Sequence, residues 1–124
     1  LKAYDVIIDA TDNFATRYLI NDACFQLQKP FIYAGIYQFE GQLALFEPPS
    51  TACYRCLYPT PAPAGLMQNC ADAGVLGILP GLLGSLQATL TIKYLLGLGE
   101  LPKNQLLSVN LLTMTFEYYP VAKA

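Results

Sequence analysis

The sequence predicts an α/β fold, with a single domain over residues 1–124 and a mostly parallel or mixed sheet. A short apolar run at residues 6–8 stops at acidic and amide residues, and helical spacing begins directly after them. A second, nearly continuous apolar run at residues 31–36 is typical of a strand covered on both faces. A strand, a crossover helix and a second strand indicate that the two strands pair in parallel. A further strand follows through a tight turn, so the edge of the sheet should be mixed.

The first strand ends in Asp9-Ala10-Thr11-Asp12-Asn13. In open α/β sheets, ligands bind in the crevice beyond the carboxyl ends of the strands, so Asp12 and Asn13 are the first candidate site residues. Both residue types also cap helices, because their side chains accept hydrogen bonds from free N–H groups. Capping and ligand binding are compatible, and both interpretations stay open.

The spacing predicts an amphipathic helix over residues 15–28, which Pro30 ends. Its apolar stripe consists of Ile20, Ala23, Cys24 and Leu27. A free cysteine on such a stripe behaves as a small hydrophobe, so Cys24 receives no chemical role. Arg17 falls in the first turn near the crevice, where it either reaches an anionic ligand or is simply solvated.

After the strand at residues 31–36, a turn around Glu40-Gly41 leads to another strand at residues 42–47, which Pro48-Pro49 ends. Residues 51–73 carry almost no periodicity and hold several prolines together with three of the four cysteines. Loops of this length are functional or disordered, so we expect a mobile, cysteine-containing loop here.

Residues 74–98 form the most hydrophobic stretch and predict a long buried helix. Its charge-free part, residues 75–86, is about 12 residues long against the roughly 20 that a membrane span needs. Pro80 should lie in the first turn, and Gly97 and Gly99 should close the helix. The expected buried stripe is Leu79, Leu83, Leu86 and Leu90, and the residues expected to allow close backbone approach are Gly77, Gly81, Gly84 and Ser85.

Residues 106–109 and 113–119 predict an antiparallel C-terminal pair of strands around a turn near Asn110.

Composition narrows the function classes. The chain is 54% hydrophobic and 13% charged, which indicates that part of its surface meets other sequence or a second subunit. A net charge of −2 does not indicate a nucleic-acid-binding surface. The absence of histidine excludes catalysis by imidazole and metal sites with histidine ligands. No stretch reads as a signal peptide, and four unevenly spaced cysteines do not form a secreted disulfide scaffold, so we expect a cytoplasmic protein.

Cys53-Tyr54-Arg55-Cys56 is a C-x-x-C pair, for which three interpretations stay open: half of a zinc site, a redox dithiol or two structural thiols. Cys70 lies just before the long helix, whose N-terminus would stabilise a thiolate, although the nearby Asp72 would oppose it. A structural cysteine is the simpler interpretation of Cys70, because no histidine is present to act as its base.

Two segments carry a family resemblance. Residues 9–17, Asp-Ala-Thr-Asp-Asn-Phe-Ala-Thr-Arg, resemble the D-x-T-D-N-x-x-x-R signature of the MoeB/ThiF adenylyltransferases, relatives of ubiquitin-activating enzymes. Residues 70–77 resemble the C-x-x-x-G-V-x-G loop of that family, and the triplet Glu40-Gly41-Gln42 also recurs there. The chain therefore resembles the C-terminal half of such an enzyme, which implies the C-terminal half of a Rossmann-like fold.

The resemblance implies activation of the C-terminal glycine carboxylate of a ubiquitin-like sulfur-carrier protein ending in Gly-Gly, with ATP and Mg²⁺. Asp12 would be a catalytic residue that ligates Mg²⁺, Asn13 and Arg17 would help to bind the nucleotide, and Cys70 would act catalytically in later sulfur or thioester chemistry. The pathway, whether molybdopterin, thiamin or tRNA thiolation, is not distinguished. Family members are commonly homodimers, so a homodimer is expected.

Two departures from the family stand beside the match. No G-x-G-x-x-G fingerprint precedes the first strand, so we expect this chain alone neither to bind ATP well nor to turn over. The family's second C-x-x-C is missing after residue 119, so Cys53 and Cys56 supply only half of a zinc site. The rival hypothesis is a non-catalytic module that binds a ubiquitin-like protein or dimerises through residues 74–98.

Overall fold

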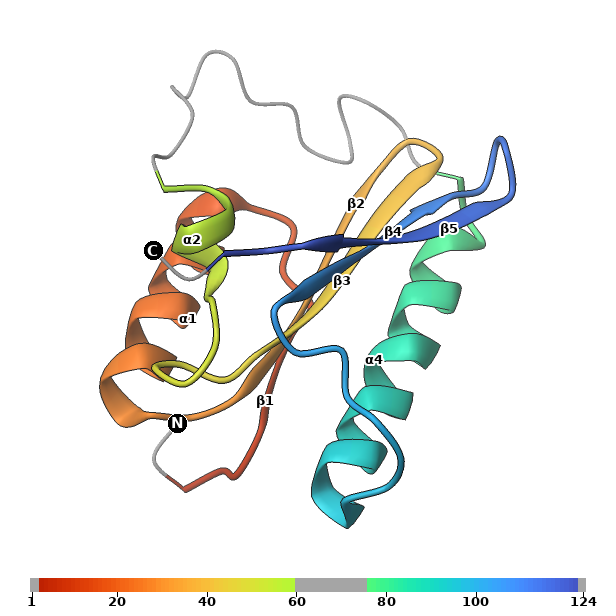
Figure 1. The fold of residues 1–124 in the computed structure, drawn as a ribbon. Coiled ribbons are helices and arrows are strands. Elements are labelled where there is room, and N and C mark those ends of the chain that lie inside the picture. The colour runs from red at the N-terminus through yellow and green to blue at the C-terminus, as the bar shows by residue number, and fades with distance from the viewer. Residues whose placement is uncertain (1–2, 60–75, 123–124) are drawn as a thin grey trace.

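The computed structural model describes residues 3–59 and 76–122 of the chain. In chain order, the elements are β1 (Ile7–Asp9), α1 (Phe14–Leu27), β2 (Phe31–Tyr37), β3 (Glu40–Phe46), α2 (Tyr54–Leu57), α4 (Leu79–Leu96), β4 (Gln105–Asn110) and β5 (Thr115–Pro120). Figure 1 shows α1 and α2 on one face of the sheet and α4 on the other. The described part of the chain is thus a three-layer α/β fold.

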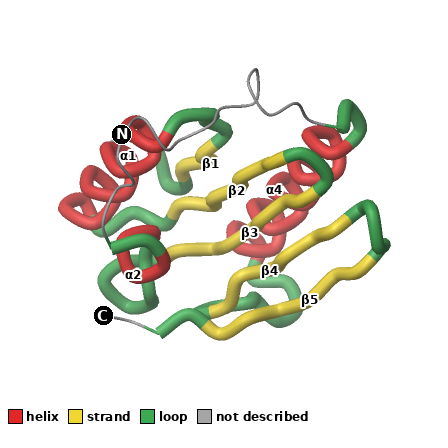
Figure 2. The backbone as a smooth tube through the Cα atoms, turned by 90° about the horizontal axis from the view of Figure 1, so that it is seen from above, coloured by secondary structure: helices red, strands yellow, loops and turns green. Residues whose placement is uncertain are grey.

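The strands lie in the order β1-β2-β3-β4-β5 (Figure 2). β1 is parallel to β2, and the three following pairs are antiparallel. The predicted mixed sheet and the antiparallel C-terminal pair are confirmed, but the parallel share is smaller than expected, because β3 also pairs antiparallel with β4. β2 and β3 form the expected hairpin. Its turn lies at Gln38 and Phe39, with a φ of 52° at Gln38, so Glu40-Gly41 begins β3 instead of forming the turn.

One core lies between the sheet and the two helices α1 and α2. Its buried side chains are Tyr18, Cys24, Phe31, Tyr33, Ala44, Phe46, Ala52, Tyr54, Leu106 and Val121. Aromatic rings form its centre, and the centroids of Tyr33 and Tyr54 are 5.0 Å apart. Ring pairs at this spacing add to the free energy of burial, so α2 is fixed against the sheet although it has only one turn.

A second core lies between the sheet and α4. Its buried side chains are Ile32, Ala34, Leu43, Leu45, Leu79, Leu83, Leu90, Leu107 and Val109. Pro80 lies in the first turn of α4 and Gly97 caps its end in the left-handed conformation, as predicted. The stripe is also as predicted except that Leu86 is half-buried, and Gln87 is buried among the leucines.

The face of α4 that points away from the sheet is open, while the predicted leucine stripe faces the core. Ile92, Leu95 and Leu96 are exposed. A methyl group added at Gly77, Gly81 or Gly84 would meet no described atom within 4 Å, so these glycines do not serve close backbone approach. A helix that covers a sheet needs only one apolar stripe, which explains why its other face is open. In the described residues, no helix has both the length and the apolarity of a membrane span.

The start of the predicted mobile loop is packed. Residues 51–54 are buried, and residues 54–57 form α2. The Tyr54 N–H donates to Asn21 Oδ1 at 2.9 Å, and Arg55 Nε lies 2.7 Å from Asp22 Oδ1, so α1 holds this segment. Residues 51–59 are therefore packed against α1 and the sheet, while the mobility of the loop stays a prediction. Residues 60–75, with the rest of the predicted loop, lie outside the described residues.

Candidate functional site

The loop after β1 is shaped by Asp9, a buried carboxylate that is 1% exposed. Its Oδ1 accepts hydrogen bonds from the Thr11 N–H at 3.0 Å and the Thr11 hydroxyl at 2.6 Å. Its main-chain carbonyl accepts from Gln87 Nε2 of α4 at 2.9 Å. Asp9 thus fixes the turn that carries the next two candidate residues, in the manner of an Asx turn.

Asp12 and Asn13 lie where the sequence predicted them, beyond the carboxyl end of β1, and both are exposed. Asn13 is the N-cap of α1, and its Oδ1 accepts from the Thr16 N–H at 2.7 Å. The capping interpretation is therefore confirmed for Asn13. Asp12 does not cap the helix, so its carboxylate faces outward at the strand tip.

Arg17 is buried, and the alternative of a solvated arginine is wrong. Its guanidinium carbon lies 5.4 Å from the ring centroid of Phe14 and 5.5 Å from that of Tyr33. Its Nη2 donates to the Thr11 carbonyl at 3.1 Å, while its Nε is buried without a hydrogen-bond partner in the described part of the chain. A guanidinium has five N–H donors, so this rigidly held cation keeps donors for an anion.

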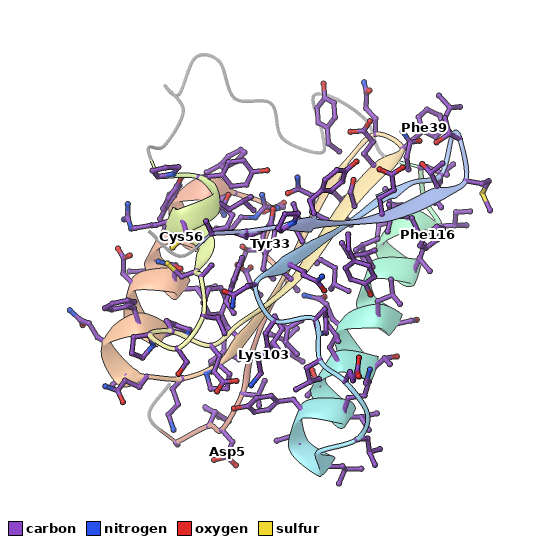
Figure 3. All side chains as sticks on the ribbon, viewed as in Figure 1. Asp5, Tyr33, Phe39, Cys56, Lys103 and Phe116 are labelled. Carbon is purple, nitrogen blue, oxygen red and sulfur yellow. The ribbon has the colours of Figure 1, made fainter. Side chains whose placement is uncertain are left out.

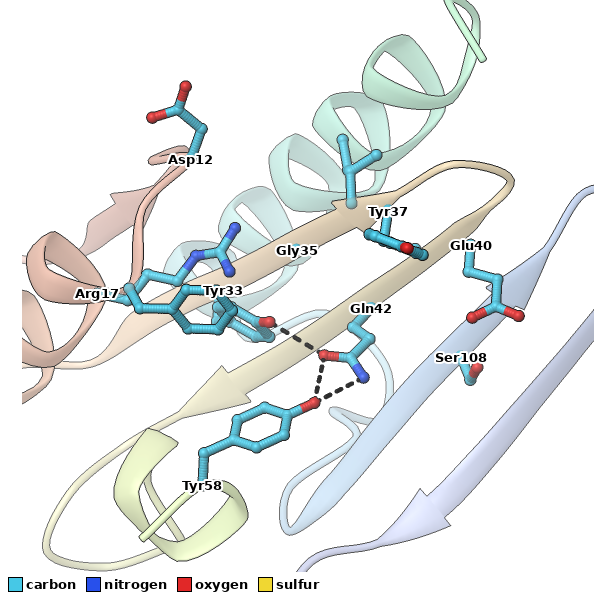
Figure 4. A pocket seen from close by; sticks show the side chains of 12 residues that line it. Asp12, Arg17, Tyr33, Gly35, Tyr37, Glu40, Gln42, Tyr58 and Ser108 are labelled. Atoms are coloured by element: carbon cyan, nitrogen blue, oxygen red, sulfur yellow. Dashed lines mark hydrogen bonds between the residues drawn. The ribbon is translucent and has the colours of Figure 1, made fainter. Parts of the chain in front are cut away.

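A hollow of about 250 Å³ opens beside these residues (Figure 4). We call it the sheet hollow, and its lining residues are Asp12, Phe14, Arg17, Tyr33, Gly35, Ile36, Tyr37, Glu40, Gly41, Gln42, Tyr58 and Ser108. Asp12 and Arg17 lie at its β1 end, and residues of β2, β3 and β4 line the remainder together with Phe14 of α1 and Tyr58, which follows α2. The sequence-predicted Asp12 and Arg17 therefore do belong to one cavity.

Three side chains within the sheet hollow are hydrogen-bonded to one another. Gln42 Oε1 accepts from the hydroxyls of Tyr33 and Tyr58, each at 3.0 Å, and Gln42 Nε2 lies 2.9 Å from the Tyr58 hydroxyl oxygen. The Tyr58 carbonyl in turn accepts from the Tyr18 hydroxyl at 2.7 Å. Burial raises the pKa of the Tyr33 hydroxyl, so Tyr33 stays a neutral donor.

A second hollow of about 300 Å³ lies on the α4 side of the same loop. Its lining residues are Ala10, Thr11, Asp12, Arg17, Ala34, Ile36, Pro80, Leu83, Gly84 and Gln87. Asp12 and Arg17 line both hollows and so stand at the boundary between them. A ligand bound at Asp12 can consequently extend to either side of the sheet edge.

The C-x-x-C pair lies at α2, on the α1 side of the sheet (Figure 3). Cys53 Sγ and Cys56 Sγ are 3.7 Å apart. Two thiolates on one tetrahedral zinc, with Zn–S of about 2.3 Å, are about 3.8 Å apart, so the pair fits half of a zinc site. Burial raises the pKa of the Cys53 thiol, and the described residues contain no cluster of three or more potential metal ligands.

The remaining two cysteines are Cys24 and Cys70. Cys70 lies outside the described residues, so its predicted role is untested. Cys24 is fully buried in the α1 core, and burial raises the pKa of its thiol to about 11, which agrees with an inert side chain.

Sequence reasoning missed Tyr33, Gln42 and Tyr58 as members of the site. The one available signal was the Glu40-Gly41-Gln42 triplet, whose glutamine points into the sheet hollow. It also missed Gln87, whose signal was a polar residue in register with Leu79 and Leu83 on the stripe of α4.

The sequence model of the ThiF family matches residues 1–124 of the chain. The "Sulfur carrier protein adenylyltransferase" of Thermus thermophilus is 45% identical over 128 residues, covering 99% of this chain and 47% of that protein. The "Adenylyltransferase and sulfurtransferase MOCS3" of Culex quinquefasciatus is 53% identical over 97 residues, covering 78% of this chain and 22% of that protein. The chain thus spans about half of the first relative's length and about a fifth of the second's.

Solved structures share the fold. The crystal structure of E. coli MccB matches with a TM-score of 0.78 at 18% identity, covering 97% of this chain and 37% of that one. The crystal structure of E. coli MccB with ATP matches with a TM-score of 0.77 at 17% identity, covering 97% of this chain and 38% of that one. At this identity the likeness is one of fold.

Proposed function

This chain belongs to the ThiF family, and on that premise we propose that it forms part of an ATP-dependent adenylyltransferase. The proposed substrate is the C-terminal glycine carboxylate of a ubiquitin-like sulfur-carrier protein ending in Gly-Gly. The observation that carries the proposal is the position of Asp12, exposed at the tip of β1 and sharing a cavity with the buried cation of Arg17. The printed names of the relatives support the same reaction class.

Asp12 suits a Mg²⁺ that accompanies ATP. Magnesium takes oxygen ligands, keeps several waters, and is held by one or two carboxylates together with substrate phosphates. An exposed carboxylate at the boundary of two hollows is such a ligand. The ion supplies charge neutralisation at the phosphates when bound.

Arg17 is the residue that orients an anion in this site. Its ring contacts with Phe14 and Tyr33 and its hydrogen bond to the Thr11 carbonyl hold the guanidinium before a ligand arrives. Preorganised donors stabilise developing charge without the cost of reorganisation. Asn13 has its Oδ1 engaged in capping, so its Nδ2 group is what it offers to the nucleotide.

Two cysteine roles complete the proposal. Cys70 would attack the acyl adenylate or take part in later sulfur transfer, because an adenylate is a good leaving group and needs no imidazole base. Cys53 and Cys56 would hold zinc as half of its ligand set, with the second pair supplied from elsewhere. Zinc there would be structural, since it would close the turn of α2.

The decisive experiment is ATP–pyrophosphate exchange in the complete adenylyltransferase that carries this chain, measured with and without the carrier protein. Asp12→Ala should abolish exchange, whereas Cys70→Ala should retain it, because adenylation precedes thiol chemistry. Asp5→Ala is the matched control, since Asp5 is an exposed aspartate outside both hollows. Exchange that survives in Asp12→Ala, or is missing in the unmodified enzyme, contradicts the proposal.

ATP binding by the isolated 124-residue chain is a separate question. We expect isothermal titration with Mg-ATP to show no micromolar binding, because no glycine-rich phosphate cradle precedes β1 in this sequence. Micromolar affinity would mean that the nucleotide site is contained in this chain.

A second candidate function is a non-catalytic module that dimerises or docks a ubiquitin-like protein. The observation that favours it is the exposed apolar side of α4, at Ile92, Leu95 and Leu96. Absence of exchange in the complete protein, together with self-association lost on changing Leu95 and Leu96 to Ser, would support the module in place of the enzyme.

A further inference from the structure

Strand register places a polar row across the floor of the sheet hollow. Gly35 of β2 lies opposite Gln42 of β3, and Gln42 lies opposite Ser108 of β4. All three line the sheet hollow, which continues at its β2 side to Arg17 and Asp12 (Figure 4). Neighbouring strands are about 5 Å apart, so the row spans about 10 Å, the length of about three residues of extended peptide.

The middle of this row is an amide that other side chains hold in place. Tyr33 and Tyr58 both donate to Gln42 Oε1, and Tyr58 is itself fixed by the Tyr18 hydroxyl at its carbonyl. With Oε1 accepting from both tyrosines and one Nε2 N–H directed at Tyr58, the second Nε2 N–H is the group that can donate to the carbonyl of a peptide bond. Because the side chain is already ordered, a peptide that binds it does not incur the entropy cost of fixing it.

Gly35, which lies opposite Gln42, leaves room for the Tyr33 hydroxyl. A methyl group added at Gly35 would lie 2.3 Å from the Tyr33 hydroxyl oxygen. The absence of a side chain at Gly35 is therefore what lets Tyr33 reach across the strand to Gln42. The two residues act together to present the amide on a flat floor that leads to Arg17.

We propose that Gln42 is a positioning residue for the substrate tail. It binds the peptide group that precedes the terminal carboxylate of the carrier protein and so holds that carboxylate beside Arg17. This inference rests on the proposed function, which names the carrier protein as substrate. It adds that Gln42 binds the backbone of the tail and that Tyr33 and Tyr58 orient the Gln42 side chain.

The test is carrier-dependent ATP–pyrophosphate exchange in the complete adenylyltransferase, with KM measured separately for carrier and for ATP. Gln42→Ala should raise KM for the carrier about tenfold, the equivalent of one hydrogen bond, and leave kcat and KM for ATP within about twofold. Tyr58→Phe removes only one of the hydroxyls that hold the amide, so its KM for the carrier should rise about threefold. Gln105→Ala is the matched control, because Gln105 is an exposed glutamine of β4 outside the sheet hollow.

The outcomes separate this inference from the function on which it rests. Exchange with an unchanged KM for the carrier in Gln42→Ala, or an equal rise in KM for ATP, overturns the role of Gln42 and leaves the proposed function intact. No exchange in the unmodified enzyme overturns the proposed function itself. If Gln42→Ala does not fold, as circular dichroism would show, the Tyr58→Phe result decides, since an unchanged KM there also overturns the inference.

Discussion

Gln87 of α4 donates from its Nε2 to the main-chain carbonyl of Asp9 at 2.9 Å and to that of Ile32 at 3.1 Å. One buried amide thus joins the long helix to the end of β1, directly before the loop that carries Asp12, and to the beginning of β2. The position of this loop therefore depends on a side chain 78 residues further along the chain.

Gln87→Leu should lower the free energy of unfolding by about 1–3 kcal/mol, because it removes the donor from two carbonyls in a buried place. Urea unfolding followed by circular dichroism measures the change. Gln26→Leu, on the exposed side of α1, is the control and should change stability by less than about 0.5 kcal/mol. Equal effects of the two substitutions would show that the Gln87 hydrogen bonds add no net stability.

Asn13 combines capping with a proposed nucleotide contact, and two substitutions separate these roles. Asn13→Ala should lower the free energy of unfolding by about 1 kcal/mol, whereas Asn13→Ser, which keeps a capping oxygen, should unfold like the original chain. In the complete enzyme, Asn13→Ser should nevertheless raise KM for ATP in the exchange assay. A stable Asn13→Ser variant with unchanged KM would leave capping as the role of Asn13.

Gly41 and Gly84 should respond in opposite directions to alanine. A Cβ at Gly41 would lie 2.7 Å from Leu83 Cδ2, so Gly41→Ala should destabilise the fold by about 1–3 kcal/mol. A Cβ at Gly84, inside α4, would meet no described atom within 4 Å, so Gly84→Ala should stabilise it by about 0.5–1 kcal/mol. Thermal melts of the two variants check this, and loss of stability in Gly84→Ala would indicate an unseen contact on that face.

Alkaline pH should destabilise the fold, because two buried acidic groups stay neutral in the folded chain but ionise when the chain unfolds. Burial raises the pKa of the Cys24 thiol from 9.0 to about 11 and that of the Tyr54 hydroxyl from 10.0 to about 12. Between the unfolded and folded pKa values the folded chain binds more protons than the unfolded one. Stability is therefore fully present below about pH 9 and falls as pH rises, through about 11 for Cys24 and about 12 for Tyr54.

Urea unfolding at about pH 8 and about pH 10.5 should show a loss of roughly 2 kcal/mol. Cys24→Ala should reduce this pH dependence whatever its own stability, because it removes the group with the lowest unfolded-state pKa of the two. The same pH dependence in both proteins would contradict the assignment to Cys24.

Much of the local structure was predictable. The Asn13 cap, Pro80 in the first turn of α4 and the left-handed Gly97 at its end each depend on a few neighbouring residues, which the sequence displays directly. The position of Asp12 beyond the end of β1 follows in the same way, because the apolar run of the strand stops just before it. The balance of parallel and antiparallel pairing was not predictable, since it depended on which strand β4 would pair with, and β4 lies far from β3 in the chain.

By itself, then, the sequence determined the two long helices, the strands and the residues at the tip of β1, because hydrophobic spacing and capping act over a few residues. It did not determine α2 or the start of β3. The tertiary structure decided the composition of the sheet hollow. Gln42 meets Tyr33 and Tyr58 only through the register of β2 against β3 and the packing of α2. Gln87 meets Asp9 only because α4 packs on β2 and β3, beside the end of β1. Contacts of this kind join residues far apart in the chain, and no local pattern encodes which of them will come together.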